Sequence, residues 1–250
     1  MELTVLGAQG TWPGAGGENC GYLVTQDGYH LQVDAGTGTF ARLQQVVGVD
    51  DVGAMLVTHG HPDHFVDIIP TFYARHYGRL GHPGLAFWSP GGFTDIAAAL
   101  VTENGRNVMA EAFDFHTAVA GEVFELGPFR VTPFEMQHIG VLSLGYRIEV
   151  GGVVLAYTGD TGPCDAAIEL GRDADMFLCE ATYQNESRLY PFHLSAAQAG
   201  EVATAAGVDH LVLTHLTPDL DHRVSIREAA ETFTGHIDIA VPGMLLEVGR

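Results

Sequence analysis

The chain has 250 residues and a formal net charge of −20, from 31 acidic and 11 basic residues, and every basic residue is arginine. Proteins that bind a nucleic acid backbone or an anionic membrane use clustered Lys and Arg, so this composition argues against a long nucleic acid or a membrane surface as partner. A hydrophobic content of 46% is typical of a globular protein. Because no linker or low-complexity segment divides the chain, we expect one domain over residues 1–250.

The three cysteines, Cys20, Cys164 and Cys179, are widely spaced and include no C-x-x-C pair. An odd number in this arrangement does not predict a disulfide framework and favours a reducing compartment. The first ten residues lack the basic and apolar segments of a signal peptide. No run of about 18 apolar residues occurs that would span a membrane. We therefore expect a cytoplasmic protein.

Short runs of β-forming residues recur along the whole chain. They cover residues 3–6, 22–25, 30–33, 54–58, 85–88, 129–135, 144–150, 153–157, 176–180, 211–214, 237–241 and 244–248. Asp27-Gly28 lies between two of these runs and predicts a hairpin turn. Helical patterns are fewer, at 65–77, 94–101, 164–170, 196–206 and 226–233, with Pro70 a possible kink in the first and Ser195 an N-cap for the fourth. Helices interleaved with two sheets predict a layered α/β sandwich.

The segment Thr58-His59-Gly60-His61-Pro62-Asp63-His64 holds four potential metal ligands within six positions. It follows an apolar strand and precedes a helix, so its side chains can converge from one loop. Imidazole and carboxylate ligands together suit Zn²⁺, and also Mn²⁺ or Fe²⁺. A solvated polar loop is the alternative, but three crowded imidazoles gain nothing there without a cation.

Three more candidate ligands, His138, Asp160 and His215, each lie just beyond the end of a predicted strand. Taken singly, each could be a turn aspartate or a hydrogen-bonded core histidine. Their shared position makes one common site the better interpretation.

This pattern, H-x-H-x-D-H followed by spaced His, Asp and His, resembles the metallo-β-lactamase superfamily of binuclear metallohydrolases, over nearly the whole chain. The resemblance implies an α/β fold of the four-layer αββα sandwich type. It also implies two bound divalent metal ions, with Zn²⁺ as the first candidate. It implies one ion held by His59, His61 and His138 and a second by Asp63, His64 and His215, with Asp160 bridging the two. Asp160 departs from the zinc β-lactamases that use a thiolate there, and we interpret the nearby Cys164 as a packing residue.

Two further segments, Cys179-Glu180-Ala181-Thr182-Tyr183 and Phe192-His193-Leu194-Ser195, resemble motifs of the tRNase Z-like phosphodiesterases. By this resemblance His193 is the general acid and Glu180 orients it. The alternatives are a helix-start residue without chemistry for His193 and a strand-end cap for Glu180. Only 22 positions separate His138 from Asp160, which leaves no room for a tRNA-binding arm. The arm-less chain is similar to the atypical class II-like cyclic nucleotide phosphodiesterases.

The sequence therefore predicts a binuclear metal-dependent phosphodiesterase that hydrolyses a small phosphodiester, with a 3′,5′-cyclic nucleotide converted to the 5′-monophosphate. Asp63 would also accept the proton of the nucleophile, and the aromatic residues Trp12, Tyr183 and Phe192 are candidates for holding the base. A lactone, thioester or β-lactam hydrolase, a tRNase Z-like RNA endonuclease and a non-catalytic metal-binding protein remain as alternatives. The resemblance also implies a homodimer.

Overall fold

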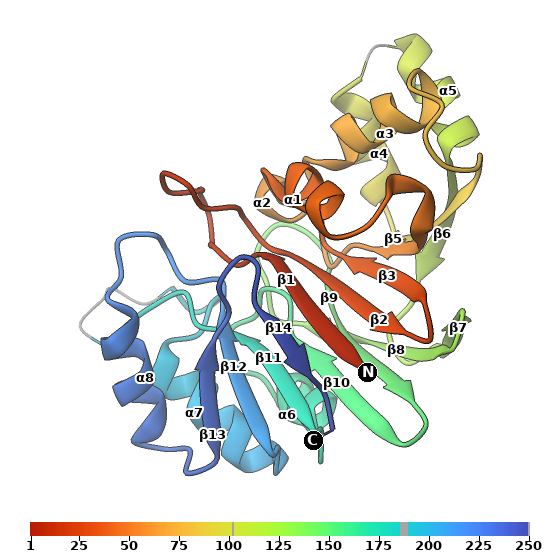
Figure 1. The fold of residues 1–250 in the computed structure, drawn as a ribbon. Coiled ribbons are helices and arrows are strands. Elements are labelled where there is room, and N and C mark those ends of the chain that lie inside the picture. Colours follow the sequence, from red (N-terminus) through yellow and green to blue (C-terminus); the bar gives the residue numbers. More distant parts are fainter. Residues whose placement is uncertain (102, 186–189, 250) are drawn as a thin grey trace.

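The computed structural model describes residues 1–101, 103–185 and 190–249 and consists of two seven-stranded sheets covered by helices (Figure 1). The first sheet has the order β14-β1-β2-β3-β4-β5-β6 and the second the order β13-β12-β11-β10-β9-β8-β7. The first is formed by β1 (Glu2–Gly7), β2 (Gly21–Gln26), β3 (Tyr29–Val33), β4 (Val52–Leu56), β5 (Leu85–Pro90), β6 (Phe113–Ala118) and β14 (Leu245–Glu247). The second is formed by β7 (Phe124–Leu126), β8 (Phe129–Met136), β9 (Ser143–Val150), β10 (Val153–Tyr157), β11 (Met176–Glu180), β12 (His210–Thr214) and β13 (His236–Ile239).

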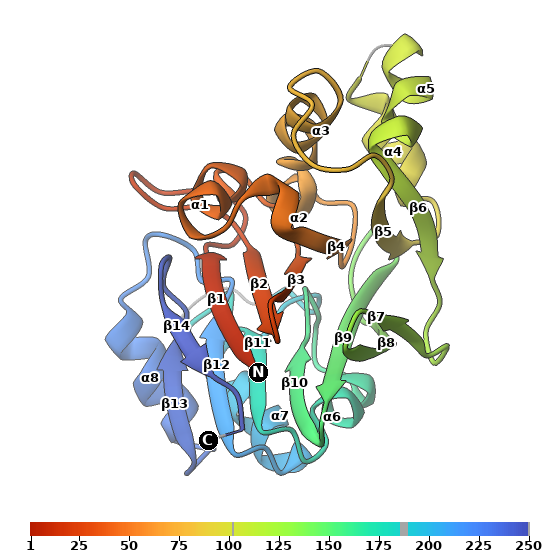
Figure 2. The same ribbon diagram turned by 45° about the vertical axis from the view of Figure 1, so that its right-hand side comes forward.

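Helices cover the outer face of each sheet. The first sheet carries α1 (Thr39–Val46), α2 (Pro62–Phe65), α3 (Ile68–His76), α4 (Phe93–Ala99) and α5 (Glu103–Ala112), of which α3, α4 and α5 group beside β5 and β6 (Figure 2). The second sheet carries α6 (Asp165–Gly171), α7 (Ala196–Ala206) and α8 (His222–Ala230). The layer order is helix, sheet, sheet, helix, which confirms the predicted four-layer sandwich.

Three apolar cores fill the spaces between these four layers. The central core lies between the two sheets and contains Val212 and Tyr157. The neighbours of Val212 on β12, Leu211 and Leu213, point the other way into the core under α6, α7 and α8. A third core, which includes Phe87, joins the first sheet to α1, α3, α4 and α5. Strands buried on both faces explain why the sequence shows continuous apolar runs rather than strict alternation.

Two local signals in the sequence determine structure as predicted. Asp27 and Gly28 both have positive φ, 51° and 78°, and form the tight turn that joins β2 to β3. Ser195 caps α7: its hydroxyl accepts from the Gln198 amide, and the Gln198 side chain accepts from the Ser195 amide. This reciprocal pair satisfies two donors at the start of the helix.

Other elements differ from the sequence-based expectation. The helix predicted over 65–77 corresponds to α3, which runs from Ile68 to His76, while the separate short helix α2 ends at Phe65. Pro70 lies in the first turn of α3, where its missing N–H removes no helical hydrogen bond. The helices α1 and α5 and the strands β6 and β7 were not predicted.

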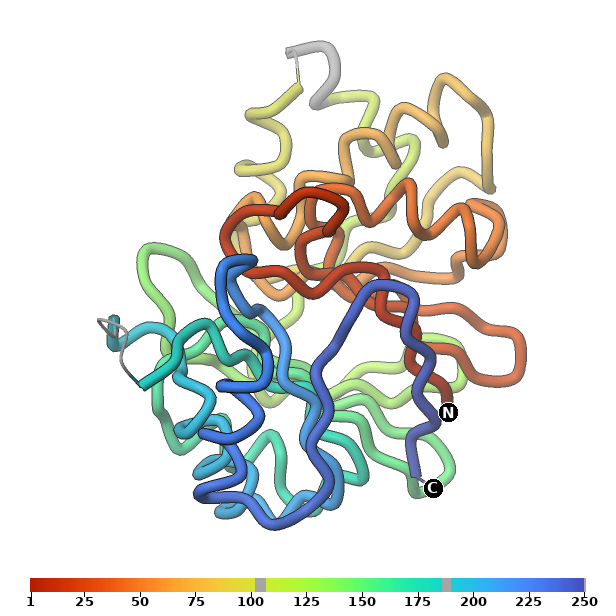
Figure 3. The backbone as a smooth tube through the Cα atoms, turned by 60° about the vertical axis from the view of Figure 1, so that its left-hand side comes forward, coloured from red at the N-terminus to blue at the C-terminus, as the bar shows by residue number. Residues whose placement is uncertain are grey.

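The two terminal segments lie side by side (Figure 3), because β1 pairs antiparallel with β14. The Val248 amide donates to the Met1 carbonyl at 2.9 Å. Within the three described ranges, none of the helices has the length and apolarity needed to cross a membrane.

The strand directions explain how distant residues reach one place. In the first sheet β3 and β4 are parallel, and in the second β10, β11 and β12 are parallel. Loops that follow parallel strands emerge at the same edge of a sheet. Asp34, His59, Asp160 and His215 all follow the carboxyl ends of such strands.

We expect Phe87→Ala to lower the free energy of unfolding by about 3–5 kcal/mol, since it empties a fully buried ring site. Phe87 contacts the rings of Phe93, Phe113 and Phe115 at centroid distances of 5.5, 5.4 and 5.2 Å. Urea denaturation measures the change. The control is Val46→Ala, at a 43% exposed position of α1, which should stay within about 0.5 kcal/mol of the parent. Equal effects would contradict this account of the third core.

Candidate metal centre and active site

The predicted ligands come together at the edge formed by both sheets. His59 and His61 lie in the loop between β4 and α2, and Asp63 and His64 belong to α2. The other three follow β8, β10 and β12, and these are His138, Asp160 and His215.

The Asp160 carboxylate lies between two groups of imidazoles. Its Oδ2 is 3.6 Å from His59 Nε2 and 3.7 Å from His138 Nε2. His61 completes this first group, with its Nδ1 at 2.9 Å from His138 Nε2. The ligand atoms of these four residues all lie within 4.8 Å of one another.

The other carboxylate oxygen of Asp160 faces the second group. Asp160 Oδ1 is 3.0 Å from His64 Nε2 and 3.2 Å from His215 Nε2. Asp63 Oδ2 is 3.3 Å from His215 Nε2 and 3.8 Å from His64 Nε2. Each oxygen of one carboxylate thus faces a separate set of ligand atoms.

Four imidazoles are fixed through Nδ1, so that Nε2 is directed to the centre. His64 Nδ1 donates to Asp34 at 2.7 Å, and His138 Nδ1 donates to the Phe192 carbonyl at 3.1 Å. His59 Nδ1 contacts the Thr58 hydroxyl at 3.1 Å, and His215 Nδ1 contacts the Thr182 hydroxyl at 2.8 Å. Such anchoring selects one tautomer and leaves the lone pair of Nε2 for a cation.

Asp34 is a functional residue that the sequence reasoning missed. Besides His64, its carboxylate accepts from the Thr58 amide at 2.8 Å and the Tyr157 hydroxyl at 2.8 Å, and it is fully buried. The signal was present, since Asp34 follows the predicted strand 30–33 just as Asp160 follows 153–157. Thr182 and the Phe192 carbonyl were also missed as anchors.

The donor set fits a cation. His59 Nε2, His64 Nε2 and Asp160 Oδ1 are buried and have no hydrogen-bond partner among the described residues. Unpaired buried polar atoms are costly and rare in native proteins, and a metal ion would satisfy all three. Burial alone would raise the pKa of the Asp160 carboxyl, but the imidazoles of His215, His64 and His59 hold that pKa well below its usual range. The carboxylate is thus in the charged form that binds metal.

Two cysteines lie near this cluster without the properties of ligands. Cys20 is within reach of His64 and His215, but burial raises the pKa of its thiol to about 12, which disfavours the thiolate. Cys164 contacts the Thr161 hydroxyl at 3.4 Å and packs against the core under α6, α7 and α8. The packing role predicted for Cys164 agrees with these contacts.

Glu180 and His193 form a pair beside the cluster. Glu180 Oε1 accepts from His193 Nδ1 at 3.0 Å, and His193 Nδ1 is 4.0 Å from Asp160 Oδ2. Glu180 is fully buried and is held by the Thr161 amide at 2.7 Å and the Thr182 hydroxyl at 2.7 Å. Burial alone would lower the pKa of His193, but the Glu180 carboxylate outweighs it and raises this pKa to about 9. The pair has the geometry of an oriented proton donor.

A hollow of about 400 Å³ opens next to His193, and its lining includes Gln137, Tyr190 and Gln198. Of the aromatic candidates, the Tyr183 ring lies edge-on to His193 at 5.9 Å, and Trp12 is 47% exposed. Phe192 contributes its carbonyl to the anchoring of His138.

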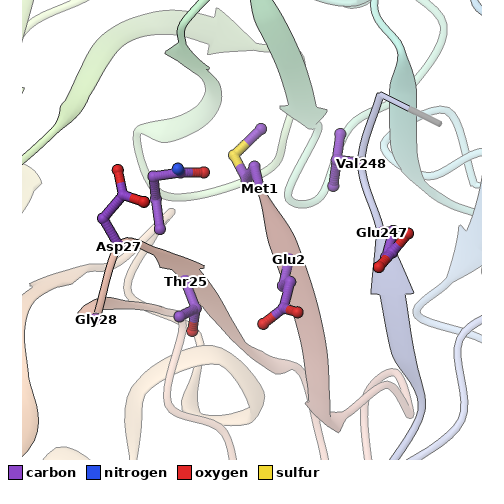
Figure 4. Close-up of a pocket in the computed structure, with 8 residues that line it drawn as sticks. Met1, Glu2, Thr25, Asp27, Gly28, Glu247 and Val248 are labelled. Atoms are coloured by element: carbon purple, nitrogen blue, oxygen red, sulfur yellow. The ribbon is translucent and has the colours of Figure 1, made fainter.

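A second hollow lies at the opposite ends of β1 and β2, where Figure 4 shows the carboxylates of Glu2, Asp27 and Glu247 around it. Glu2 and Glu247 are register partners on neighbouring strands. Carboxylates repel an anion, so this hollow does not suit an anionic substrate.

The chain is similar to known proteins in both sequence and structure. A family model described as a beta-lactamase superfamily domain matches residues 29–216. An uncharacterized protein of Mycobacterium tuberculosis is 34% identical, over 100% of this chain and 93% of the relative. The probable metallo-hydrolase YhfI of Bacillus subtilis is 29% identical over 99% of this chain and 100% of its own length. A crystal structure of YhfI superposes with a TM-score of 0.89 at 26% identity, covering 98% of this chain and 99% of that one. Ribonuclease Z of Methanopyrus kandleri is 28% identical over 100% of this chain and 99% of its own length.

Gly36→Ala should disrupt the cluster, because a Cβ at this position would lie 2.0 Å from the Asp63 carbonyl oxygen. The helix α2, which carries Asp63 and His64, would have to move. We expect a large loss of metal per chain, measured by elemental analysis after dialysis against Zn²⁺. The matched control is Gly91→Ala, where the nearest atom is 3.9 Å away, and its metal content should equal the parent's. Full metal content in Gly36→Ala would show that the position of this helix is not needed.

Removing divalent metal with a chelator should lower stability, because it leaves the unpaired atoms of His59, His64 and Asp160 without a partner. At a free Zn²⁺ concentration about 100 times the dissociation constant, each bound ion raises the free energy of unfolding by about 2.7 kcal/mol. Urea denaturation with and without Zn²⁺ measures it. Coincident curves would contradict the interpretation of the cluster as a metal centre.

Proposed function

The chain belongs to the beta-lactamase superfamily and is a metallo-hydrolase, and within that family we propose that it is a binuclear phosphodiesterase. Its substrate is a small phosphodiester, a 3′,5′-cyclic nucleotide hydrolysed to the 5′-monophosphate. The observation that carries the proposal is the Glu180–His193 pair, 4.0 Å from the carboxylate that would bridge the two metal ions.

His59, His61 and His138 are the proposed ligands of one cation and Asp63, His64 and His215 those of the other. Asp160 would bind both cations. Its two oxygens support this assignment, because each faces a different group of imidazoles. Zn²⁺ is the proposed ion, and the same ligands accept Mn²⁺ or Fe²⁺. When bound, two such ions polarise the phosphoryl group and make water a stronger nucleophile near neutral pH.

The proton transfers belong to the residues of the chain. Asp63 accepts the proton of the water in this proposal, and its Oδ2 accepts from the Thr11 amide at 2.7 Å. As the bond from phosphorus to the ribose oxygen breaks, His193 gives its proton to that oxygen. Glu180 holds His193 through Nδ1, so the other ring nitrogen, Nε2, is the donor.

The hollow beside His193 is the proposed place of the leaving group. Gln137 and Gln198 supply amide groups and Tyr190 an aromatic ring, which are the groups that recognise a nucleobase edge and face. The Gln137 side chain also donates to the Pro191 carbonyl at 3.2 Å, which fixes one wall.

A small substrate is favoured over RNA by two features. The segment between His138 and Asp160 forms the antiparallel strands β9 and β10 and their short turn, so no long arm projects from it. The net charge of −20 repels a polyanion, whereas one phosphodiester needs only the local charge of two cations.

The proposal is tested by assaying the Zn²⁺- or Mn²⁺-loaded protein on a set of substrates in parallel. The set contains 3′,5′-cyclic nucleotides, bis-p-nitrophenyl phosphate, a lactone and a precursor tRNA. We expect hydrolysis of the cyclic nucleotides. Lactone hydrolysis without diester hydrolysis, or cleavage of the precursor tRNA alone, would overturn the proposal.

Replacing the proposed acid separates its role from that of the metal ions. His193→Ala should slow cyclic nucleotide hydrolysis by about 10²–10⁴-fold, because an alkoxide leaving group needs a proton. It should slow bis-p-nitrophenyl phosphate much less, since p-nitrophenolate leaves without one. Metal content per chain should stay unchanged, and His222→Ala, an exposed position on α8, is the matched control. Equal slowing of both substrates would exclude the general-acid role.

The homodimer implied by the resemblance and the cytoplasmic location expected from the sequence stay predictions. Light scattering of the purified chain tests the oligomeric state.

A further inference from the structure

A second group of metal-ligating side chains lies away from the proposed catalytic centre. His210 begins β12, and His236 and Asp238 belong to the neighbouring strand β13. The strands are parallel with His210 opposite His236 and Val212 opposite Asp238. Because alternate residues of a strand share a face, His210, His236 and Asp238 lie on the same face of the sheet. Val212, which lies on that face, belongs to the central core, so the group lies at the edge of the space between the sheets.

The spacing of the three side chains matches one cation. His210 Nε2 is 3.0 Å and His236 Nε2 is 3.5 Å from the same oxygen, Asp238 Oδ2. The three ligand atoms all lie within 4.8 Å of one another. A tetrahedral Zn²⁺ with bonds of about 2.0–2.1 Å places its ligand atoms about 3.3 Å apart. The observed distances bracket that value.

The two imidazoles lie together beside one carboxylate. His210 Nε2 shares a hydrogen bond with Asp238 Oδ2 at 3.0 Å, and the His210 and His236 rings are stacked with centroids 4.2 Å apart and planes 19° apart. Two imidazole nitrogens thus lie within 3.5 Å of one carboxylate oxygen, and these are ligand types that Zn²⁺ binds.

We propose that His210, His236 and Asp238 form a separate binding site for a divalent cation, with Zn²⁺ as the ion and an open coordination position. The site lies at the opposite end of β12 from His215, about 16 Å away along an extended strand. It therefore shares no ligand with the catalytic cluster. Its effect is structural: the cation fastens β13, the edge strand of the second sheet, to β12.

The test compares bound zinc in the whole chain and in three variants, by elemental analysis after dialysis against micromolar Zn²⁺. His236→Ala removes an exposed ligand, and Asp238→Asn keeps the shape and a hydrogen-bonding oxygen but removes the charge. Each should lose one equivalent of zinc per chain, while His222→Ala, an exposed histidine outside both clusters, should lose none. Crystals of the zinc-loaded chain should show an anomalous peak between the three side chains, absent in His236→Ala.

Hydrolytic activity is the second measurement. His236→Ala and Asp238→Asn should hydrolyse bis-p-nitrophenyl phosphate as the parent does, since neither residue is near the catalytic cluster. The proposal is overturned if both variants keep the zinc content of the parent, or if His222→Ala loses as much as they do. Zinc that enters the site only at millimolar concentration would equally overturn it.

Discussion

The buried carboxylate of Asp160 is the constraint on which the site depends. A charged group with 2% exposure is stable only if opposite charge surrounds it, and here imidazoles approach both of its oxygens. Those imidazoles also lie close to one another, so a cation between them and the carboxylate would satisfy both sides. The layered fold supplies the geometry, because strands of both sheets end where this carboxylate lies.

Hydrogen bonds from other buried residues fix the orientation of the proposed ligands and of His193. Asp34 fixes His64, and Thr182 joins His215 to Glu180, which in turn holds His193. The proposed metal site and the proposed proton donor are therefore mechanically connected through one hydroxyl. Thr182 thus contacts a proposed metal ligand and the partner of the proposed acid at once.

The sequence predicted the layers and the ligand cluster because both depend on local patterns. Apolar runs mark buried strands, and histidines within one short loop must lie close together wherever that loop is. It did not predict Asp34 or the Phe192 carbonyl as anchors, since their roles depend on which side chain reaches them across the fold. The helix predicted over 65–77 begins only at Ile68, and Asp67 just before it accepts from the Phe40 amide, a contact 27 positions away. Long-range contacts of this kind have no signature in residue spacing.

The ligand-bearing loops are also widely separated in the order of synthesis. The early ligand loop, His59 to His64, leaves the ribosome long before His215, which follows β12. The first proposed set of ligands is complete at Asp160, whereas the second also needs His215, at residue 215 of 250. The full set of proposed ligands therefore exists only once about 86% of the chain has been synthesised.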